Sequence, residues 1–454
     1  MSFASVNPAT GDALDEYPAH STDELDARLD RAVAGFEANR DRSLEERARR
    51  LDRAADLLEE RADRYGALMT REMGKPVDQA EAEAEKCAWV CRYYAEHGAD
   101  FLADEPVETD AQTSYVAYEP LGPVLAVMPW NFPFWQLFRF GAPALMAGNT
   151  VLLKHAPNVP GCALAIEELL RDAGFTDHEL QALLIEEDAV AGVLADHRVR
   201  AATLTGSVGA GTAVAQQAAA QVKPTVLELG GSDPFIVCAD ADLEAAASVG
   251  CTARMQNNGQ SCIAAKRFIV EAPVADDFTE RFIEKVEALT IGDPQDPHTD
   301  IGPMARQDLR SAVHDQVERA IGEGVLAAAG GHTIDREGFY YAPTVLTDVQ
   351  PGTVAFEEEI FGPVASVVVA DDAEHALTLA NDTRFGLGGS IFTEDREKGE
   401  RMARGLEAGC AFVNEMTKSD PRLPFGGIKD SGYGRELSRH GIREFVNAKT
   451  VWVE

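Results

Sequence analysis

The stretch NNGQSC, residues 257–262, ends in a cysteine that follows four polar residues and one glycine. A cysteine that serves only packing behaves as a small hydrophobe and is expected among apolar neighbours. We therefore interpret Cys262 as a thiol that a ligand can reach, which a nucleophilic cysteine requires.

Two further residues complete a candidate catalytic group. Glu228 lies near the end of the apolar stretch TVLEL, before two glycines, at the kind of strand end where open α/β sheets bind ligands. Asn131 lies in the turn MPWNFP, whose prolines hold its amide in a fixed direction. An amide aimed at a developing oxyanion typically lowers a barrier by about 3–4 kcal/mol. Taken alone, Glu228 is better explained as a solvated carboxylate and Asn131 as part of a structural turn.

A glycine-rich turn, LTGSVGAG, lies between a predicted strand and a predicted helix. Ser207 stands between Gly206 and Gly211, where the helix is expected to begin, and a helix N-terminus is a favourable place for a phosphate group. The spacing is not G-x-G-x-x-G, so a tight turn without a ligand explains this stretch almost as well.

Together these residues favour oxidation of an aldehyde through a thioester. The thiolate of Cys262 adds to the carbonyl carbon, and Asn131 stabilises the oxyanion. A bound nicotinamide accepts hydride, and Glu228 activates the water that hydrolyses the thioester. The cofactor is therefore expected to be NAD or NADP. No metal site is expected, because the closely spaced Cys87 and Cys91 have no histidine pair to complete a zinc pattern.

Short apolar strands that alternate with helices must position these residues. The stretches 124–128, 150–154, 201–205 and 225–229 are predicted strands, and the alternation begins again after Gly231. Strands separated by helices indicate parallel βαβ units, so an α/β fold with two such domains is expected. Before them, two helices begin with capping boxes at Ser21 and Ser43, and both are expected to cover one side of a sheet.

The charge of the chain is extreme, with 76 acidic and 41 basic residues among 454 and a net charge of −35. Such a surface excludes nucleic acid and anionic membranes as partners. The sequence shows neither a signal peptide nor an apolar span, and its seven scattered cysteines predict a cytoplasmic protein. Acids spread along the whole chain indicate adaptation to high salt, where the Debye length falls to roughly 3 Å. A salt-loving source organism is the resulting hypothesis.

From NPATG near its start to GGIKDSGYGRE near its end, the chain resembles the NAD(P)-dependent aldehyde dehydrogenase superfamily. The motifs PWNFP, TGSVGAG, ELGG, NNGQSC, EEIFGP and PFGGIKDSGYGRE stand in the family's order, and Cys262 follows Glu228 by the family's 34 positions. The resemblance implies that Cys262 is the nucleophile and Glu228 the general base. Asn131 and the backbone N–H of Cys262 would be the oxyanion donors.

The resemblance also implies where a dinucleotide cofactor binds. Lys154 matches a lysine that binds the adenosine ribose, Ser207 a pyrophosphate contact, and Glu359 a glutamate on the nicotinamide ribose. The implied cofactor-binding residues are Trp130, Lys154, Gly206, Ser207, Gly211, Leu229, Glu359 and Phe361. NAD-preferring members often have a glutamate where this chain has Pro157, so no carboxylate repels the 2′-phosphate of NADP, and both NAD and NADP stay open as the cofactor.

Arg139 and Ser419 are the implied substrate-binding residues. Arg139 matches an arginine with which succinate-semialdehyde dehydrogenases grip the distal carboxylate, and a guanidinium fork suits a carboxylate. A buried salt bridge is the alternative explanation for Arg139. Some members have a second arginine where this chain has Gln256. The candidate substitutes are Arg254, Ser419 and Arg422.

The resemblance implies three structural units: a Rossmann-like cofactor domain (1–103 and 121–230), an α/β catalytic domain (231–433) and a small β oligomerisation element (104–120 and 434–454). A dimer or a tetramer is expected. The expected reaction converts succinate semialdehyde to succinate, with 2,5-dioxopentanoate or glutarate semialdehyde as alternative substrates. Acyl transfer to coenzyme A is disfavoured by the presence of Glu228, and a non-catalytic protein of this fold by the retention of all three catalytic residues.

Overall fold

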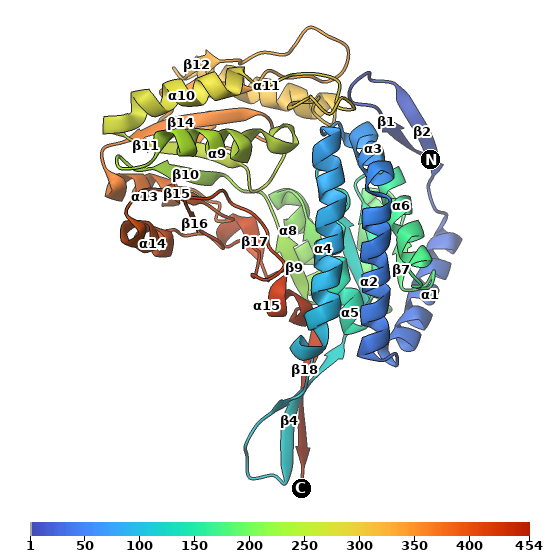
Figure 1. The fold of residues 1–454 in the computed structure, drawn as a ribbon. Helices are drawn as coiled ribbons and strands as arrows, with labels where there is room; N and C mark the ends of the chain where they lie inside the picture. Colours follow the sequence, from blue (N-terminus) through green and yellow to red (C-terminus); the bar gives the residue numbers. More distant parts are fainter. Residues whose placement is uncertain (1) are drawn as a thin grey trace.

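The computed structural model describes residues 2–454, which form two large sheets and one small sheet (Figure 1). The first large sheet has six strands and is parallel except for its edge strand β17. In order across the sheet, its strands are β17 (Gly432–Tyr433), β9 (Thr225–Glu228), β8 (Ala201–Thr205), β5 (Pro123–Met128), β6 (Thr150–His155) and β7 (Leu180–Ala182).

Eight helices accompany this sheet along residues 22–220 of the described chain. They are α1 (Thr22–Arg40), α2 (Leu44–Glu60), α3 (Ala62–Met73), α4 (Val77–Phe101), α5 (Trp135–Ala147), α6 (Pro160–Asp172), α7 (Val190–Ala195) and α8 (Val208–Ala220). A hairpin of β1 (Ser2–Val6) and β2 (Ala13–Pro18) precedes them. The predicted strands at 124–128, 150–154, 201–205 and 225–229 are confirmed, because uninterrupted apolar runs suit parallel strands covered on both faces.

The second large sheet has seven strands, and only β12 runs antiparallel to its neighbour. In order they are β12 (Leu326–Ala329), β13 (Thr344–Thr347), β14 (Val364–Ala370), β11 (Ala265–Glu271), β10 (Asp233–Val237), β15 (Ser390–Phe392) and β16 (Phe412–Val413). Its helices are α9 (Leu243–Met255), α10 (Ala275–Glu287), α11 (Gln307–Gly322), α12 (Val354–Glu357), α13 (Ala373–Asn381) and α14 (Arg396–Gly405).

The small sheet forms an arm that extends from the body of the molecule (Figure 1). It pairs β4 (Thr113–Pro120) with β3 (Glu105–Pro106) and with the C-terminal strand β18 (Val446–Val453), as the sequence predicted for these two segments. The short helix α15 (Ser438–Arg443) leads into β18. The domain boundaries stay a prediction. One detail differs from them, because β17 belongs to the predicted catalytic segment but pairs with β9.

The predicted capping boxes are present, because Ser21 and Ser43 accept hydrogen bonds from the N–H groups of Glu24 and Glu46. The prediction that both helices cover one side of a sheet is wrong. Leu29 of α1 packs in the apolar cluster that contains alternate strand residues such as Leu125. The helix α2 instead belongs to the cluster on the opposite face, which contains their neighbours such as Val124.

One carboxylate joins two of these helices. Glu83 of α4 accepts hydrogen bonds of 2.9 Å from the N–H groups of Phe134 and Trp135 at the start of α5, where backbone donors lack helical partners. The buried ammonium group of Lys75 forms an ion pair with the same carboxylate. Glu83 therefore orients α5 against α4.

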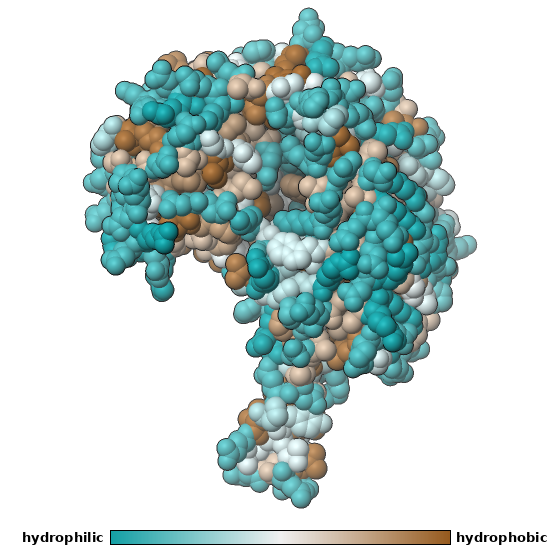
Figure 2. Space-filling view, viewed as in Figure 1, coloured by the Kyte–Doolittle hydropathy of each residue, from teal (hydrophilic) through white to brown (hydrophobic). Residues whose placement is uncertain are grey.

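The face of the molecule seen in Figure 2 is mostly hydrophilic, with a hollow between the two lobes. This agrees with the dispersed acidic residues of the sequence. Among residues 2–454, no helix combines the length and the apolar composition that a bilayer crossing requires.

Candidate active site

The turn before Cys262 has left-handed backbone at three consecutive residues, with φ of 56° at Asn257, 57° at Asn258 and 71° at Gly259. A Cβ atom at Gly259 would lie 2.5 Å from the carbonyl carbon of Gly362, so no larger residue fits against this neighbouring backbone. The turn is thereby locked against the EEIFGP segment.

The asparagine side chains hold this turn in place. Asn257 Nδ2 donates to the carbonyl oxygens of Asn131 (2.9 Å) and Gln260 (3.0 Å), and Asn258 Nδ2 donates to those of Gly74 and Pro303. The polar residues that pointed to Cys262 in the sequence therefore support the backbone that carries it.

Cys262 lies where two cavities meet. One has a volume of about 350 Å³ and the other about 250 Å³, and Cys262 and Gln136 line both. Burial raises the pKa of the Cys262 thiol to about 11, against the opposing effect of the positive charges of Arg139 and Lys266. The sulfur is therefore a thiol at neutral pH, and attack on a carbonyl requires that a base take its proton.

A buried lysine fixes the backbone of the cysteine. Lys266 Nζ donates to the carbonyl oxygens of Cys262 (2.8 Å) and Ser261 (3.0 Å) and lies 3.5 Å from Glu359 Oε1. Within residues 2–454, the N–H of Cys262 itself forms no hydrogen bond. This N–H is thus a donor that a ligand in the cavities can use.

Asn131 lies beside this donor, in the wall of the smaller cavity. Its Nδ2 donates to the carbonyl oxygen of Gln260 at 3.1 Å. An amide nitrogen carries two hydrogens, so one remains for a ligand. The structure therefore brings together the two donors that the sequence suggested for an oxyanion.

Glu228 is buried but lines neither of these two cavities. Neither of its carboxyl oxygens has a hydrogen-bond partner in the described part of the chain. Burial, followed by the negative charge of Glu436, raises its pKa well above the ordinary range. Its surroundings therefore favour the protonated form of Glu228, which must turn toward the sulfur and ionise before it can act as a base.

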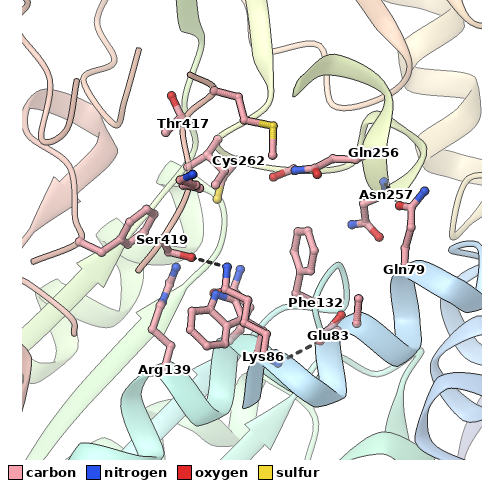
Figure 3. Close-up of a pocket in the computed structure, with 18 of the residues that line it drawn as sticks. Gln79, Glu83, Lys86, Phe132, Arg139, Gln256, Asn257, Cys262, Thr417 and Ser419 are labelled. Carbon is pink, nitrogen blue, oxygen red and sulfur yellow. Dashed lines mark hydrogen bonds between the residues drawn. The ribbon is translucent and has the colours of Figure 1, made fainter. Parts of the chain in front are cut away.

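The larger cavity is walled by α4, by α5 and by the segment that precedes Phe425 (Figure 3). Arg139 lines it, but its guanidinium forms a buried ion pair with Glu436 and lies over the ring of Phe425, 4.6 Å from the ring centre. The alternative explanation for Arg139, a buried salt bridge, therefore describes this structure. Its contact with a substrate stays a prediction.

Of the three candidate substitutes for the missing arginine, only Ser419 lines the larger cavity. Arg254 donates to the carbonyl oxygens of Gly259, Ile360 and Val364, so it braces the cysteine turn. Arg422 is exposed and lies 2.6 Å from Asp420. Neither arginine reaches the larger cavity, because each is engaged elsewhere.

Lys86 of α4 also lines the larger cavity and was not predicted from the sequence. Its Nζ donates to Ser419 Oγ at 2.9 Å and lies 4.3 Å from the ring centre of Trp135 (Figure 3). The only available signal was helical spacing, which places Gln79, Glu83 and Lys86 on one face of α4.

Six predicted cofactor-binding residues line the smaller cavity together: Trp130, Gly206, Ser207, Leu229, Glu359 and Phe361. The rings of Trp130 and Phe361 meet edge to face, with centres 5.8 Å apart. Glu359 Oε1 accepts a hydrogen bond of 3.1 Å from the N–H of Gly231. The sequence motifs thus converge on one wall.

The predicted residues Gly211 and Lys154 do not line this cavity. A Cβ at Gly211 would lie 2.5 Å from Leu229 Cδ2, so close packing of α8 on the sheet explains this glycine. Burial lowers the pKa of Lys154, and the carboxylates of Glu187 and Glu186 oppose that shift. Lys154 therefore lies in an acidic neighbourhood.

The residues present fit a dinucleotide. Ser207 caps the 13-residue helix α8, because its Oγ accepts a hydrogen bond of 3.3 Å from the N–H of Ala210. The N-terminus of α8 opens on the smaller cavity. Backbone N–H groups at such an end bind phosphate oxygens. A Cβ at Gly209 would meet no atom within 4 Å, which leaves room for a ligand. Among residues 2–454, no group of three or more histidines, cysteines or carboxylates is placed to hold a metal ion.

Comparison with known proteins identifies relatives over the full length. A protein of Synechocystis sp. named "probable succinate-semialdehyde dehydrogenase", with NADP(+), is 55% identical over 453 residues and 100% of both chains. Succinate-semialdehyde dehydrogenase (NADP(+)) 1 of Mycobacterium tuberculosis is 52% identical, again over 100% of both chains. The structure of the succinic semialdehyde dehydrogenase of Streptococcus pyogenes with NADP+ matches with a TM-score of 0.97 and 37% identity over 99% of each chain. The model of the aldehyde dehydrogenase family matches residues 1–451, and the chain belongs to that family.

Proposed function

We propose that this protein oxidises succinate semialdehyde to succinate, with NADP as the electron acceptor. The observation that carries the proposal is the position of Cys262 between a cavity lined by the predicted cofactor residues and a cavity lined by cationic side chains. An aldehyde that bears a carboxylate needs both features around one nucleophile. The names of the full-length relatives support the same substrate and cofactor.

In the proposed reaction, the Cys262 thiol loses its proton to water in the cavities, and the sulfur then bonds to the aldehyde carbon while the carbonyl electron pair moves to the oxygen. The oxyanion that forms accepts hydrogen bonds from the Cys262 N–H and from the second amide hydrogen of Asn131. When bound, the nicotinamide cofactor supplies the hydride acceptor. Trp130, Ser207 and Phe361 would hold it from the wall of the smaller cavity.

The thioester on Cys262 is then hydrolysed. Glu228 would turn toward the sulfur, ionise and accept a proton from the attacking water. Burial raises the pKa of Glu228 and so disfavours its ionised form, and this step is therefore expected to accelerate as the pH rises. The products are succinate and the regenerated thiol.

Pro157 supports NADP as the proposed cofactor, because this position carries no carboxylate to repel a 2′-phosphate. The carboxylates of Glu186 and Glu187, near Lys154, would repel a 2′-phosphate and therefore disfavour NADP. A comparison of kcat/KM for NADP and NAD tests this part, and a higher value for NAD would reject NADP as the physiological acceptor.

The substrate is tested with a panel of succinate semialdehyde, glutarate semialdehyde, 2,5-dioxopentanoate and propanal, each assayed by formation of reduced nicotinamide. The highest kcat/KM is expected for succinate semialdehyde. A higher value for propanal, or a rate that requires coenzyme A, would refute the proposal.

A further inference from the structure

The larger cavity contains one cation without an ionised partner among the described residues. Arg139 pairs with Glu436, and Lys418, at the rim, lies 2.7 Å from Glu415. Within residues 2–454, no carboxylate forms an ion pair with Lys86, whose Nζ donates to the neutral hydroxyl of Ser419. The net positive charge in this cavity therefore resides on Lys86.

The surroundings of Lys86 leave its charge available to a ligand. The ring of Trp135 offers its face to the ammonium group, which is a favourable but weak contact. The nearest acids are committed elsewhere, because Glu83 pairs with Lys75 and Asp420 lies 2.6 Å from the guanidinium of Arg422. A partly buried ammonium group without a counter-ion is costly, and an anion in the cavity would relieve that cost.

We propose that Lys86 binds the distal carboxylate of the substrate, with Ser419 Oγ as the second donor. An ammonium group has three donor hydrogens, so the bond to Ser419 leaves two. The Ser419 oxygen accepts from Lys86, and its own hydrogen is available for the same carboxylate. This inference rests on the proposed function and names the residue that would distinguish an acid aldehyde from a neutral one.

Arg139 has a different part in this arrangement. Its guanidinium pairs with Glu436 and stacks on Phe425, so its charge is already compensated within the protein. Lys86, on α4, and Cys262 line the same cavity (Figure 3). Both residues are therefore exposed to a ligand in this cavity.

The test compares the wild-type protein with Lys86→Met, which keeps the length of the side chain and removes its charge. Loss of a hydrogen bond to a charged group costs about 1.5–3 kcal/mol, so kcat/KM for succinate semialdehyde should fall about 10- to 150-fold, mainly through KM. The value for propanal should change by less than about threefold, because propanal has no carboxylate. Lys86→Arg, which retains the charge, should recover part of the loss.

Lys418→Met is the matched control, because it removes a nearby cation whose charge Glu415 already neutralises. Its effect on succinate semialdehyde should be about twofold or less. Inhibition by succinate gives a readout that does not depend on turnover, and its inhibition constant should rise in Lys86→Met by the same factor as KM. If Lys86→Met does not fold, Ser419→Ala should raise KM for succinate semialdehyde several-fold and leave propanal unchanged.

The outcomes separate the inference from the function on which it rests. A wild-type protein that prefers propanal would refute the proposed function. A wild-type protein that prefers succinate semialdehyde, with the preference intact in Lys86→Met, would overturn only the role of Lys86. Equal losses for both aldehydes would also overturn it, since they would indicate a structural effect.

Discussion

The two cavities that meet at Cys262 are assembled in different ways. The smaller one is lined by short loops at strand ends, where PWNFP, TGSVGAG, ELGG and EEIFGP bring their residues together. The larger one is lined by helix faces and by a late segment, so its walls join residues as distant as Lys86 and Ser419. Sequence motifs therefore identify the residues of the cofactor wall, whereas the residues that select the substrate are brought together only by the fold.

Removal of the Cys262 sulfur, which both cavities share, should reduce activity most. Cys262→Ala should lower kcat by more than about a thousandfold, because no other group in the cavities can form the thioester. The dissociation constant of NADP, measured through the quenching of tryptophan fluorescence, should change little. Residual turnover at a tenth of the wild-type rate would mean that the two cavities do not meet at the reacting atom.

Glu228→Gln should affect one half of the reaction. Stopped-flow measurement should retain a burst of reduced nicotinamide, while steady-state turnover falls about 100-fold because water is no longer activated. The glutamine keeps the size of the side chain, so the fold is preserved. Loss of the burst together with turnover would place Glu228 in the first half of the reaction instead.

The pH dependence of KM tests whether the charge of Lys86 selects the substrate. Burial lowers the pKa of Lys86 to about 8; Arg139 acts in the same direction, and Cys87, Glu83 and Asp420 oppose it. The ammonium form therefore prevails below pH 8 and is lost above it. KM for succinate semialdehyde should rise above pH 8 by up to about tenfold per unit, while KM for propanal should show no such rise. Parallel profiles for both aldehydes would contradict this interpretation.

The smallest expected effect concerns the acids near Lys154. Glu187→Gln should lower KM for NADP about two- to threefold in dilute buffer, because one repulsive charge is removed. The change should disappear in molar salt, where charges are screened over roughly 3 Å. Kinetics at both salt concentrations, with NAD as the control, measure this effect, and an equal change with NAD would exclude repulsion of the 2′-phosphate.

Salt also bears on the source of the protein. A surface with a net charge of −35 predicts maximal stability at high ionic strength. The salt-loving source organism stays a prediction, and the names of the relatives give it no support.

Local signals in the sequence predicted the elements well. The stretch 201–205 is strand β8 to the residue, and the serine caps of α1 and α2 are present. Such features depend on neighbours within a few positions, which a sequence displays directly. The cofactor wall was predictable for the same reason.

Features that depend on distant partners were not predictable. The sequence did not indicate that Arg139 pairs with Glu436 or that α1 and α2 lie on opposite faces. The packing of Gly211 against Leu229 likewise requires the fold. In each case the sheet topology determines which residues are neighbours, and the periodicity of the sequence alone does not specify that topology.

The helix α4 carries Glu83 and Lys86 about one turn apart, and the two side chains have different roles. The first anchors the start of α5 through backbone amides, so its replacement would disturb the scaffold. The second faces the cavity and supports no backbone group in residues 2–454. If Lys86 binds the distal carboxylate as proposed, substitutions at position 86 should shift the preference of the enzyme toward uncharged or cationic aldehydes and leave the scaffold intact.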